Sequence, residues 1–154
     1  MLVTACGGGA GSTTSSPTAL SGSIATTGPA PPDQLAGFTR LEVRVGGEAW
    51  QVAVADTPAL RSRGLMGVTD LGDVRGMLFL WEDDTSGGFW MRDTLIPLDI
   101  AFFDAAGVLV DLLSMTPCRE DPCPTYRPSG PYRAALEAPA GGFDGLDIVG
   151  LTLP

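Results

Sequence analysis

The sequence predicts a mainly β domain, a compact sandwich or barrel with one short helix, preceded by a disordered tether. Two observations predict the domain: apolar residues recur at every second position in short segments, and Gly, Pro and Asp turns separate these segments. A third observation predicts the tether, because 25 of the 30 residues from 7 to 36 are Gly, Pro, Ser, Thr or Ala. Such a stretch has too little apolar surface to fold. Residues 37–154 are then expected to form a single globular domain.

The first two strands are expected at residues 41–45 and 50–54. Apolar and charged residues alternate over residues 41–45, which is typical of a half-buried strand. The pair Gly46-Gly47 supplies a turn, and the alternation then resumes from Trp50. We therefore expect two neighbouring strands in one sheet.

A short helix is expected over about residues 57–66. Asp56 and Thr57 are both candidate N-caps, and Pro58 suits the first turn, where a backbone N–H has no helical partner. Gly67 is expected to end the helix. Alternation after this point predicts further strands at residues 77–81, 88–91, 96–103, 108–114 and 133–138.

The composition excludes several classes of function. The chain has nine Arg, no Lys, no His and 18 acidic residues, which gives a formal net charge of −9. A nucleic-acid groove needs clustered basic residues, so we expect no nucleic-acid partner. Without histidine, Ser-His-Asp and Cys-His catalysis and His-ligated metal sites are impossible. We expect no metal, no other cofactor and a monomer.

The first six residues indicate a lipoprotein. Residues 2–6, Leu-Val-Thr-Ala-Cys, match the bacterial lipobox, in which the cysteine receives the lipid. We expect residues 1–6 to be the end of a signal whose basic and apolar parts are encoded upstream of Met1. Lipid on Cys6 would anchor the protein to a membrane, on the extracytoplasmic side of the cell envelope. The alternative is a chance cysteine in a disordered end.

Cys118 and Cys123 are expected to form a disulfide. If Cys6 carries lipid, these two are the remaining cysteines of an exported chain, and they lie in a Pro-rich loop. The alternative is a metal or redox pair. A disulfide would hold Asp121 and Tyr126 ready as the rim of a pocket.

The residues that follow Gly88 predict a cleft. Trp90 alternates with apolar Phe89 and Met91. It is expected either to pack in the core between layers or, if those two residues face the core, to face outward or into a cleft beside Arg92. An indole in such a place is a platform for a sugar or another flat ligand. Asp99 lies among apolar residues and needs a partner, either Arg92 or backbone N–H groups. The candidate cleft residues are Trp90, Arg92, Asp99, Asp121, Tyr126 and Glu137, and no catalytic residue is assigned.

Several of these segments resemble one family, the domain of unknown function 192. The segment Phe-Trp-Met-Arg-Asp-Thr-Leu-Ile-Pro-Leu-Asp-Ile-Ala-Phe at residues 89–102 carries the most specific part of the resemblance. Residues 64–66, 76–79, 117–126 and 136–141 are also similar to the family. The resemblance implies a jelly-roll-like β-sandwich with a short helix, often exported, and implies no reaction. The chain has Arg92-Asp93 where the family usually has Lys-Asn.

Two functions are consistent with these features. The first is a lipid-anchored extracytoplasmic module that binds a small molecule, a glycan or another envelope component in an aromatic and carboxylate cleft. The alternative is a small hydrolase of envelope glycans that pairs Asp99 with Glu137 or Asp121 as acid and base. Two carboxyl groups about 5 to 10 Å apart across one open cleft would favour the hydrolase.

Overall fold

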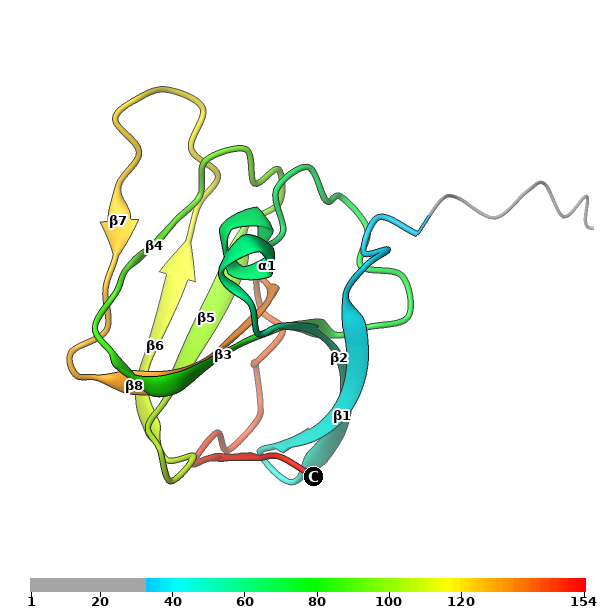
Figure 1. Cartoon of the computed structure of the whole chain (residues 1–154), viewed down its shortest axis with the longest axis vertical. Helices are drawn as coiled ribbons and strands as arrows, with labels where there is room; N and C mark the ends of the chain where they lie inside the picture. The colour runs from blue at the N-terminus through cyan, green and yellow to red at the C-terminus, as the bar shows by residue number, and fades with distance from the viewer. Residues whose placement is uncertain (1–32) are drawn as a thin grey trace, which may run out of the picture. The chain divides into compact units, whose positions relative to one another are not determined.

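The computed structural model describes residues 33–154 of the chain. This part contains nine strands and one helix (Figure 1). The prediction of a mainly β domain with one short helix is confirmed. In chain order the elements are β1 (Thr39–Val45), β2 (Glu48–Ala55), α1 (Pro58–Arg63), β3 (Gly76–Thr85), β4 (Phe89–Trp90), β5 (Leu98–Phe103), β6 (Leu109–Met115), β7 (Thr125–Tyr126), β8 (Tyr132–Pro139) and β9 (Leu151–Thr152).

Seven strands form one sheet that curls into a half-barrel. The order across this sheet is β6-β5-β8-β3-β2-β1-β9, and neighbouring strands are antiparallel except for β2 and β3. Helix α1 lies in the connection between these two parallel strands and packs in front of the sheet (Figure 1). Strands β4 and β7 form a separate two-stranded sheet. The curl brings α1, β3 and β4 around one hollow.

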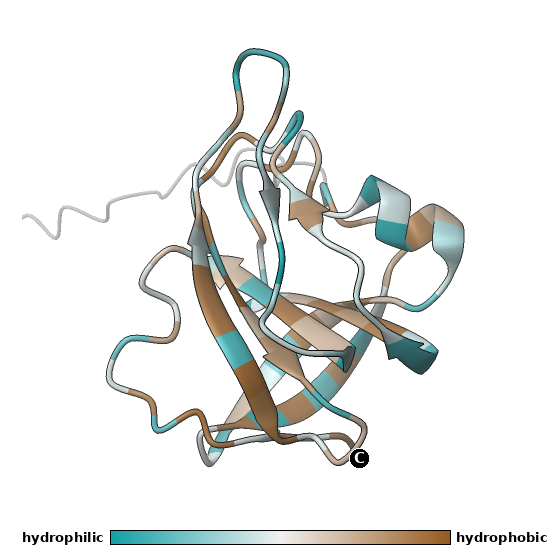
Figure 2. Ribbon diagram, turned by 90° about the vertical axis from the view of Figure 1, so that its left-hand side faces the viewer, coloured by the Kyte–Doolittle hydropathy of each residue, from teal (hydrophilic) through white to brown (hydrophobic). Residues whose placement is uncertain are grey.

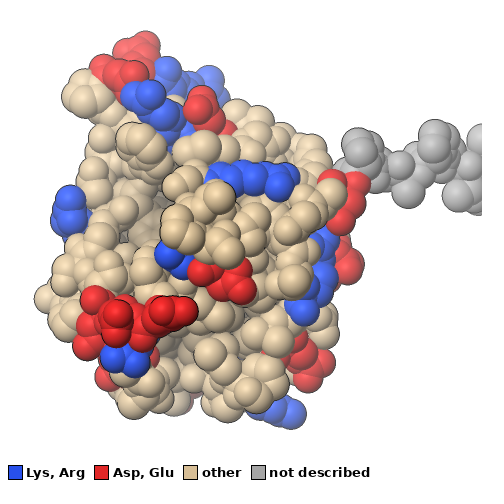
Figure 3. Space-filling model, viewed as in Figure 1, with Lys and Arg blue, Asp and Glu red and all other residues tan. Residues whose placement is uncertain are grey.

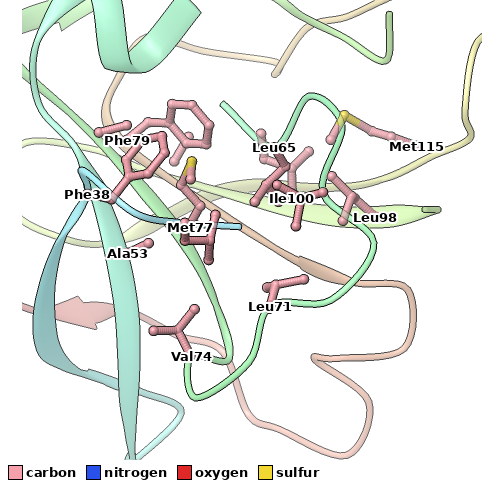
Figure 4. Close-up of a cluster of buried hydrophobic side chains, with 14 of the residues drawn as sticks. Phe38, Ala53, Leu65, Leu71, Val74, Met77, Phe79, Leu98, Ile100 and Met115 are labelled. Atoms are coloured by element: carbon pink, nitrogen blue, oxygen red, sulfur yellow. The ribbon is translucent and has the colours of Figure 1, made fainter. Parts of the chain in front are cut away.

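The two faces of the curled sheet carry two separate apolar cores. Side chains alternate between faces along each strand, as in β5, where Ile100 and Phe102 enter one core while Ala101 and Phe103 enter the other. The strand expected at residues 96–103 is confirmed over Leu98–Phe103. Figure 4 shows the first core, in which side chains from β3 and β5 pack together, and Figure 2 shows that the strands are largely hydrophobic.

Helix α1 is shorter than the expected helix at residues 57–66. Thr57 is the N-cap, with its hydroxyl oxygen accepting from the Leu60 N–H at 3.3 Å. Gly64 ends the helix because it adopts a φ of +48°, which glycine tolerates best, while its N–H donates to the Leu60 carbonyl at 2.9 Å. The chain therefore leaves the helix three residues before Gly67, and Leu65 and Val68 beyond it are buried in the first core.

The domain begins earlier than the expected boundary at residue 37. Leu35 is fully buried in the first core, and Asp33 forms an ion pair with Arg40 at 3.0 Å. Residues 33–36 therefore belong to the domain and not to the tether. The rest of the expected tether and the lipobox Cys6 lie outside the described residues. Among the helices of the described part, none is long and apolar enough to cross a membrane.

Strands β7 and β9 were not expected from the sequence. Each has only two residues, so neither can show an alternating pattern. Strand β5 lies between β6 and β8, inside the sheet. Pro97 precedes the first paired residue, Leu98, and its missing N–H therefore removes no bond from the sheet.

Candidate functional site

A groove of about 380 Å³ lies between α1 and strands β3, β4 and β8. Figure 3 shows a hollow on this face of the molecule, with acidic side chains gathered beside it. Helix α1 forms one wall with Pro58, Arg61 and Ser62. The opposite wall is aromatic and consists of Phe79, Trp81, Phe89, Trp90 and Tyr132.

The aromatic wall is held in place by edge-to-face contacts between its own rings. Trp81 meets Tyr132 with ring centroids 5.2 Å apart, and Phe89 meets Phe79 at 5.0 Å. The Tyr132 hydroxyl donates to the Gly87 carbonyl at 2.9 Å, and burial raises the pKa of Tyr132 to about 12. Trp90 lies at the rim with 52% of its surface exposed, which agrees with the outward one of the two orientations expected from the sequence. The groove is therefore a preformed apolar surface with one open edge.

The groove continues into a narrow pocket of about 40 Å³ that ends at Glu137. The two spaces share residues of α1 and the rings of Phe79, Phe89 and Trp90. Glu137 is only 5% exposed, and its carboxyl group makes no hydrogen bond or ion pair within the described part of the chain. Burial raises the pKa of this carboxyl to about 8, because the charged form loses its hydration.

The position of Glu137 follows from the alternation of β8. Ala135 points into the first core and Glu137, two residues on, shares that face, whereas Ala134, Leu136 and Ala138 enter the second core. A Cβ at Gly76 would overlap the Glu137 carbonyl oxygen. The absence of a side chain at Gly76 thus lets β3 approach β8 closely at the end of the narrow pocket.

Two arginines of α1 border the narrow pocket, but both are engaged elsewhere. Arg61 donates to the carbonyls of Asp56 and Leu80 at 2.6 and 2.7 Å, and its guanidinium lies over the Trp81 ring at 5.1 Å. Arg63 donates to the carbonyls of Ala36 and Gln34 at 3.0 and 3.1 Å. Neither guanidinium contacts Glu137, which therefore lacks a counter-ion.

The outer end of the groove opens into an acidic hollow of about 770 Å³. Asp56 lines it from the start of α1, and Glu82, Asp83 and Asp84 line it from the end of β3. Asp84 is paired with Arg133 at 2.7 Å, whereas the other three acids form no ion pair within residues 33–154. The groove therefore runs from an acidic mouth to a buried carboxyl.

The loop between β6 and β7 contains the expected disulfide. Cys118 and Cys123 are bonded, with Cα atoms 5.6 Å apart. Arg92 connects this loop to the rim of the groove, because it forms an ion pair with Asp121 and lies over the Trp90 ring at 5.2 Å. Trp90, Arg92 and Asp121 are thus brought together. In Figure 2 the tip of the loop, at the top of the view, is hydrophilic.

Tyr126 lies next to this assembly without lining the groove. It pairs with Phe89 across the small sheet of β4 and β7. Its hydroxyl accepts from the Thr116 N–H at 3.2 Å and so ties β7 to the end of β6. Tyr126 therefore supports the aromatic wall from behind.

Asp99 does not lie in the candidate cleft. Along β5 it shares the face of Ala101 and Phe103, whereas Glu137 of β8 lies on the face of Ile100, its partner in the sheet. Asp99 accepts a hydrogen bond from the Gly141 N–H at 2.7 Å, which is the backbone partner expected as one of two possibilities. The sheet itself separates the two carboxyl groups, so they cannot serve one cleft.

The sequence alone does not identify most of the residues that line the groove. Phe79, Trp81 and Tyr132 line it, and the alternation over residues 77–81 contains a usable signal, because Phe79 and Trp81 share one face. That face is not recognisable as a groove until β4 and α1 are placed over it. In the described part of the chain, no group of three or more Cys, Asp or Glu side chains is arranged to hold a metal ion.

Residues 41–152 match the family model DUF192, described as an uncharacterized ACR. The chain belongs to the DUF192 family. This match runs from within β1 to the end of β9 and includes all the residues of the aromatic wall, so the groove is part of the DUF192 domain.

Two solved structures are similar to this DUF192 domain. A protein of unknown function from Novosphingobium aromaticivorans DSM 12444 is 30% identical, with a TM-score of 0.68, over 77% of this chain and 89% of that one. A protein from Sinorhizobium meliloti 1021, described as a candidate transcription regulator, is 25% identical, with a TM-score of 0.66, over 75% of this chain and 94% of that one. The search of curated proteins found no match.

Proposed function

We propose that this DUF192 protein is a binding module that takes a small organic ligand in the aromatic groove above Glu137. The observation that carries the proposal is a groove that adjoins a narrow pocket lined by Glu137, a buried carboxyl without a partner among residues 33–154. Ligand sites are commonly concave, mostly apolar and supplied with a few polar groups that orient the ligand. The aromatic wall and Glu137 fit that description.

The arrangement of carboxyl groups favours binding over the two-carboxylate hydrolase. Asp99 lies on the other face of the sheet from Glu137, and Asp121 is neutralised by Arg92. The acids of the outer hollow face Trp81 and Arg61 and belong to a different pocket from Glu137. Acid and base catalysis on a glycoside requires two carboxyl groups on either side of one bond, and Asp99, Glu137 and Asp121 do not line one cleft together.

The same proposal places the domain outside the cytoplasm, held at a membrane by lipid on Cys6. The lipobox at residues 2–6, the Gly- and Ser-rich segment after it and the Cys118–Cys123 disulfide all support this placement. Ligands available there include sugars, small metabolites and other components of the cell envelope. A groove on a tethered domain suits capture of such a ligand.

Replacing Trp90 with Ala should weaken ligand binding about tenfold, because the exposed indole supplies the open edge of the aromatic wall. The measurement is a ¹H–¹⁵N NMR titration of the 154-residue chain with benzyl alcohol and with methyl β-glucoside as neutral probes. We expect at least one probe to shift the indole N–H signals of Trp81 and Trp90.

Leu95→Ala is the matched control for this titration. Leu95 is also exposed, at 57%, but does not line the groove, so its truncation should leave affinity unchanged. The proposal is wrong if neither neutral probe nor a charged one perturbs the groove, or if Trp90→Ala and Leu95→Ala weaken binding equally.

A further inference from the structure

We infer that the groove takes an organic cation, whose flat apolar part stacks on Phe89 and Trp90 and whose amidinium, guanidinium or ammonium group meets Glu137. This inference rests on the proposed binding function and specifies the class of ligand. It depends on the isolation of Glu137, on the nature of the groove walls and on the charge of the groove mouth.

Within residues 33–154, Glu137 lacks the partner that buried carboxyl groups ordinarily have. Almost all buried polar side chains in proteins form a hydrogen bond, and an unpartnered one requires an explanation. The pocket of about 40 Å³ in front of Glu137 is large enough for a water molecule or for the polar end of a ligand. Thr94 and Met66 line the same pocket but form no hydrogen bond with Glu137. A ligand group that reaches this pocket would complete the hydrogen bonding of the carboxyl.

The walls of the groove favour a positive charge on that ligand. Aromatic faces attract cations, and the Arg61 guanidinium already lies 5.1 Å from the centre of the Trp81 ring. At the mouth, Asp56, Glu82 and Asp83 carry no ion pair within the described residues, and the whole chain has a formal net charge of −9. These charges attract a cation to the groove and repel an anion.

No internal cation neutralises Glu137. The charged groups on the elements packed around it are Arg61 and Arg63 of α1, which line the narrow pocket. Their guanidiniums donate to backbone carbonyls of residues outside the pocket and form no ion pair with Glu137. Strands β3 and β5 place Met77 and Ile100 beside it, and the segment after β4 contributes Thr94. A planar cation with two N–H donors would form the paired hydrogen bonds that carboxylates accept best.

Such a cation would bind the ionised form of Glu137 and displace its proton. Because burial raises the pKa of the free carboxyl to about 8, the proton must leave for the ion pair to form. Affinity for a cation should therefore rise about tenfold per pH unit up to pH 8 and level off above it. A neutral ligand that accepts a hydrogen bond from the protonated acid would show the opposite trend.

Benzamidinium and benzamide are the probes that test this inference, because they match in shape and differ in charge. Calorimetric titration of the 154-residue chain between pH 6 and pH 9 should show benzamidinium binding at least tenfold more tightly than benzamide at pH 8. Glu137→Gln should remove that preference and its pH dependence. Glu42→Gln, the same change on the exposed face of β1, should alter neither.

A second measurement does not depend on the folding of the Glu137→Gln variant. The carboxyl ¹³C signal of Glu137 in the unaltered chain should titrate at least one pH unit lower when benzamidinium is present. Equal binding of the two probes, or tighter binding of benzamide at low pH, overturns the cation while leaving the binding module intact. If benzamidinium does not bind but a neutral probe still binds in the groove, the cation inference is wrong and the binding module stands. If no probe binds at all, both the cation inference and the proposed binding function are wrong.

Discussion

Replacing Glu137 with Gln should make the domain more stable than the parent protein at pH 9, by several kcal/mol. The parent carboxyl has a pKa of about 8 when folded and about 4.5 when unfolded. Between these values the unfolded chain has released the proton that the folded chain keeps, so the free energy of unfolding falls as the pH rises. The full loss is on the order of 5 kcal/mol at most, and Gln, which carries no proton to lose, avoids it.

Urea unfolding of both proteins at pH 5 and at pH 9 measures this effect. The difference between parent and variant cancels the contribution of every other titrating group, and Glu42→Gln controls for loss of one acid on the surface. The two proteins should have similar stability at pH 5 and diverge at pH 9. Parallel behaviour of parent and Glu137→Gln at both pH values would show that Glu137 is solvated or partnered in the folded state.

Replacing Cys6 with Ser should move the protein from the membrane fraction to the soluble fraction of a bacterium that expresses the gene with its upstream coding sequence. Serine cannot accept the thioether-linked lipid, and two or more acyl chains are what make such an anchor stable. The effect on localisation should be nearly complete. Fractionation followed by immunoblotting measures it.

The control for this experiment is Ser12→Ala, which alters the same segment without touching the lipobox. It should stay with the membranes. Recovery of the parent protein in the soluble fraction, or retention of Cys6→Ser on membranes, would remove the lipid anchor from the proposal. The binding groove lies in residues 58–137 and is tested independently of this result.

The sequence is sufficient to predict features that depend on residues close together along the chain. Alternation over residues 96–103 predicts a strand, and β5 lies within that range at Leu98–Phe103. The same rule allows an outward position for Trp90, which is exposed. The Cys118–Cys123 bond closes a loop of four intervening residues, so its partners also lie close along the chain.

The features that the sequence did not reveal depend on which strands are neighbours. Glu137 belongs to β8, which lies between β5 and β3, and nothing in the local pattern shows that this placement leaves it beneath α1 and β4. The same pairing sets Asp99 on the opposite face, against the backbone of Gly141. Leu35 falls within the expected tether because its neighbours are small and polar. Its burial, the Asp33–Arg40 ion pair and the hydrogen bonds from Arg63 to residues 34 and 36 hold this segment on the domain.

The most direct test of whether the groove ends at a buried carboxyl without a partner is the titration of Glu137 itself. Selective ¹³C labelling of glutamate side chains resolves the carboxyl signals by NMR, and the Glu137→Gln spectrum identifies the one that belongs to Glu137. The structure predicts a midpoint near pH 8 for that signal, because burial opposes ionisation and no arginine compensates. A midpoint at or below 4.5, the ordinary value for this group, would mean that Glu137 is hydrated or paired.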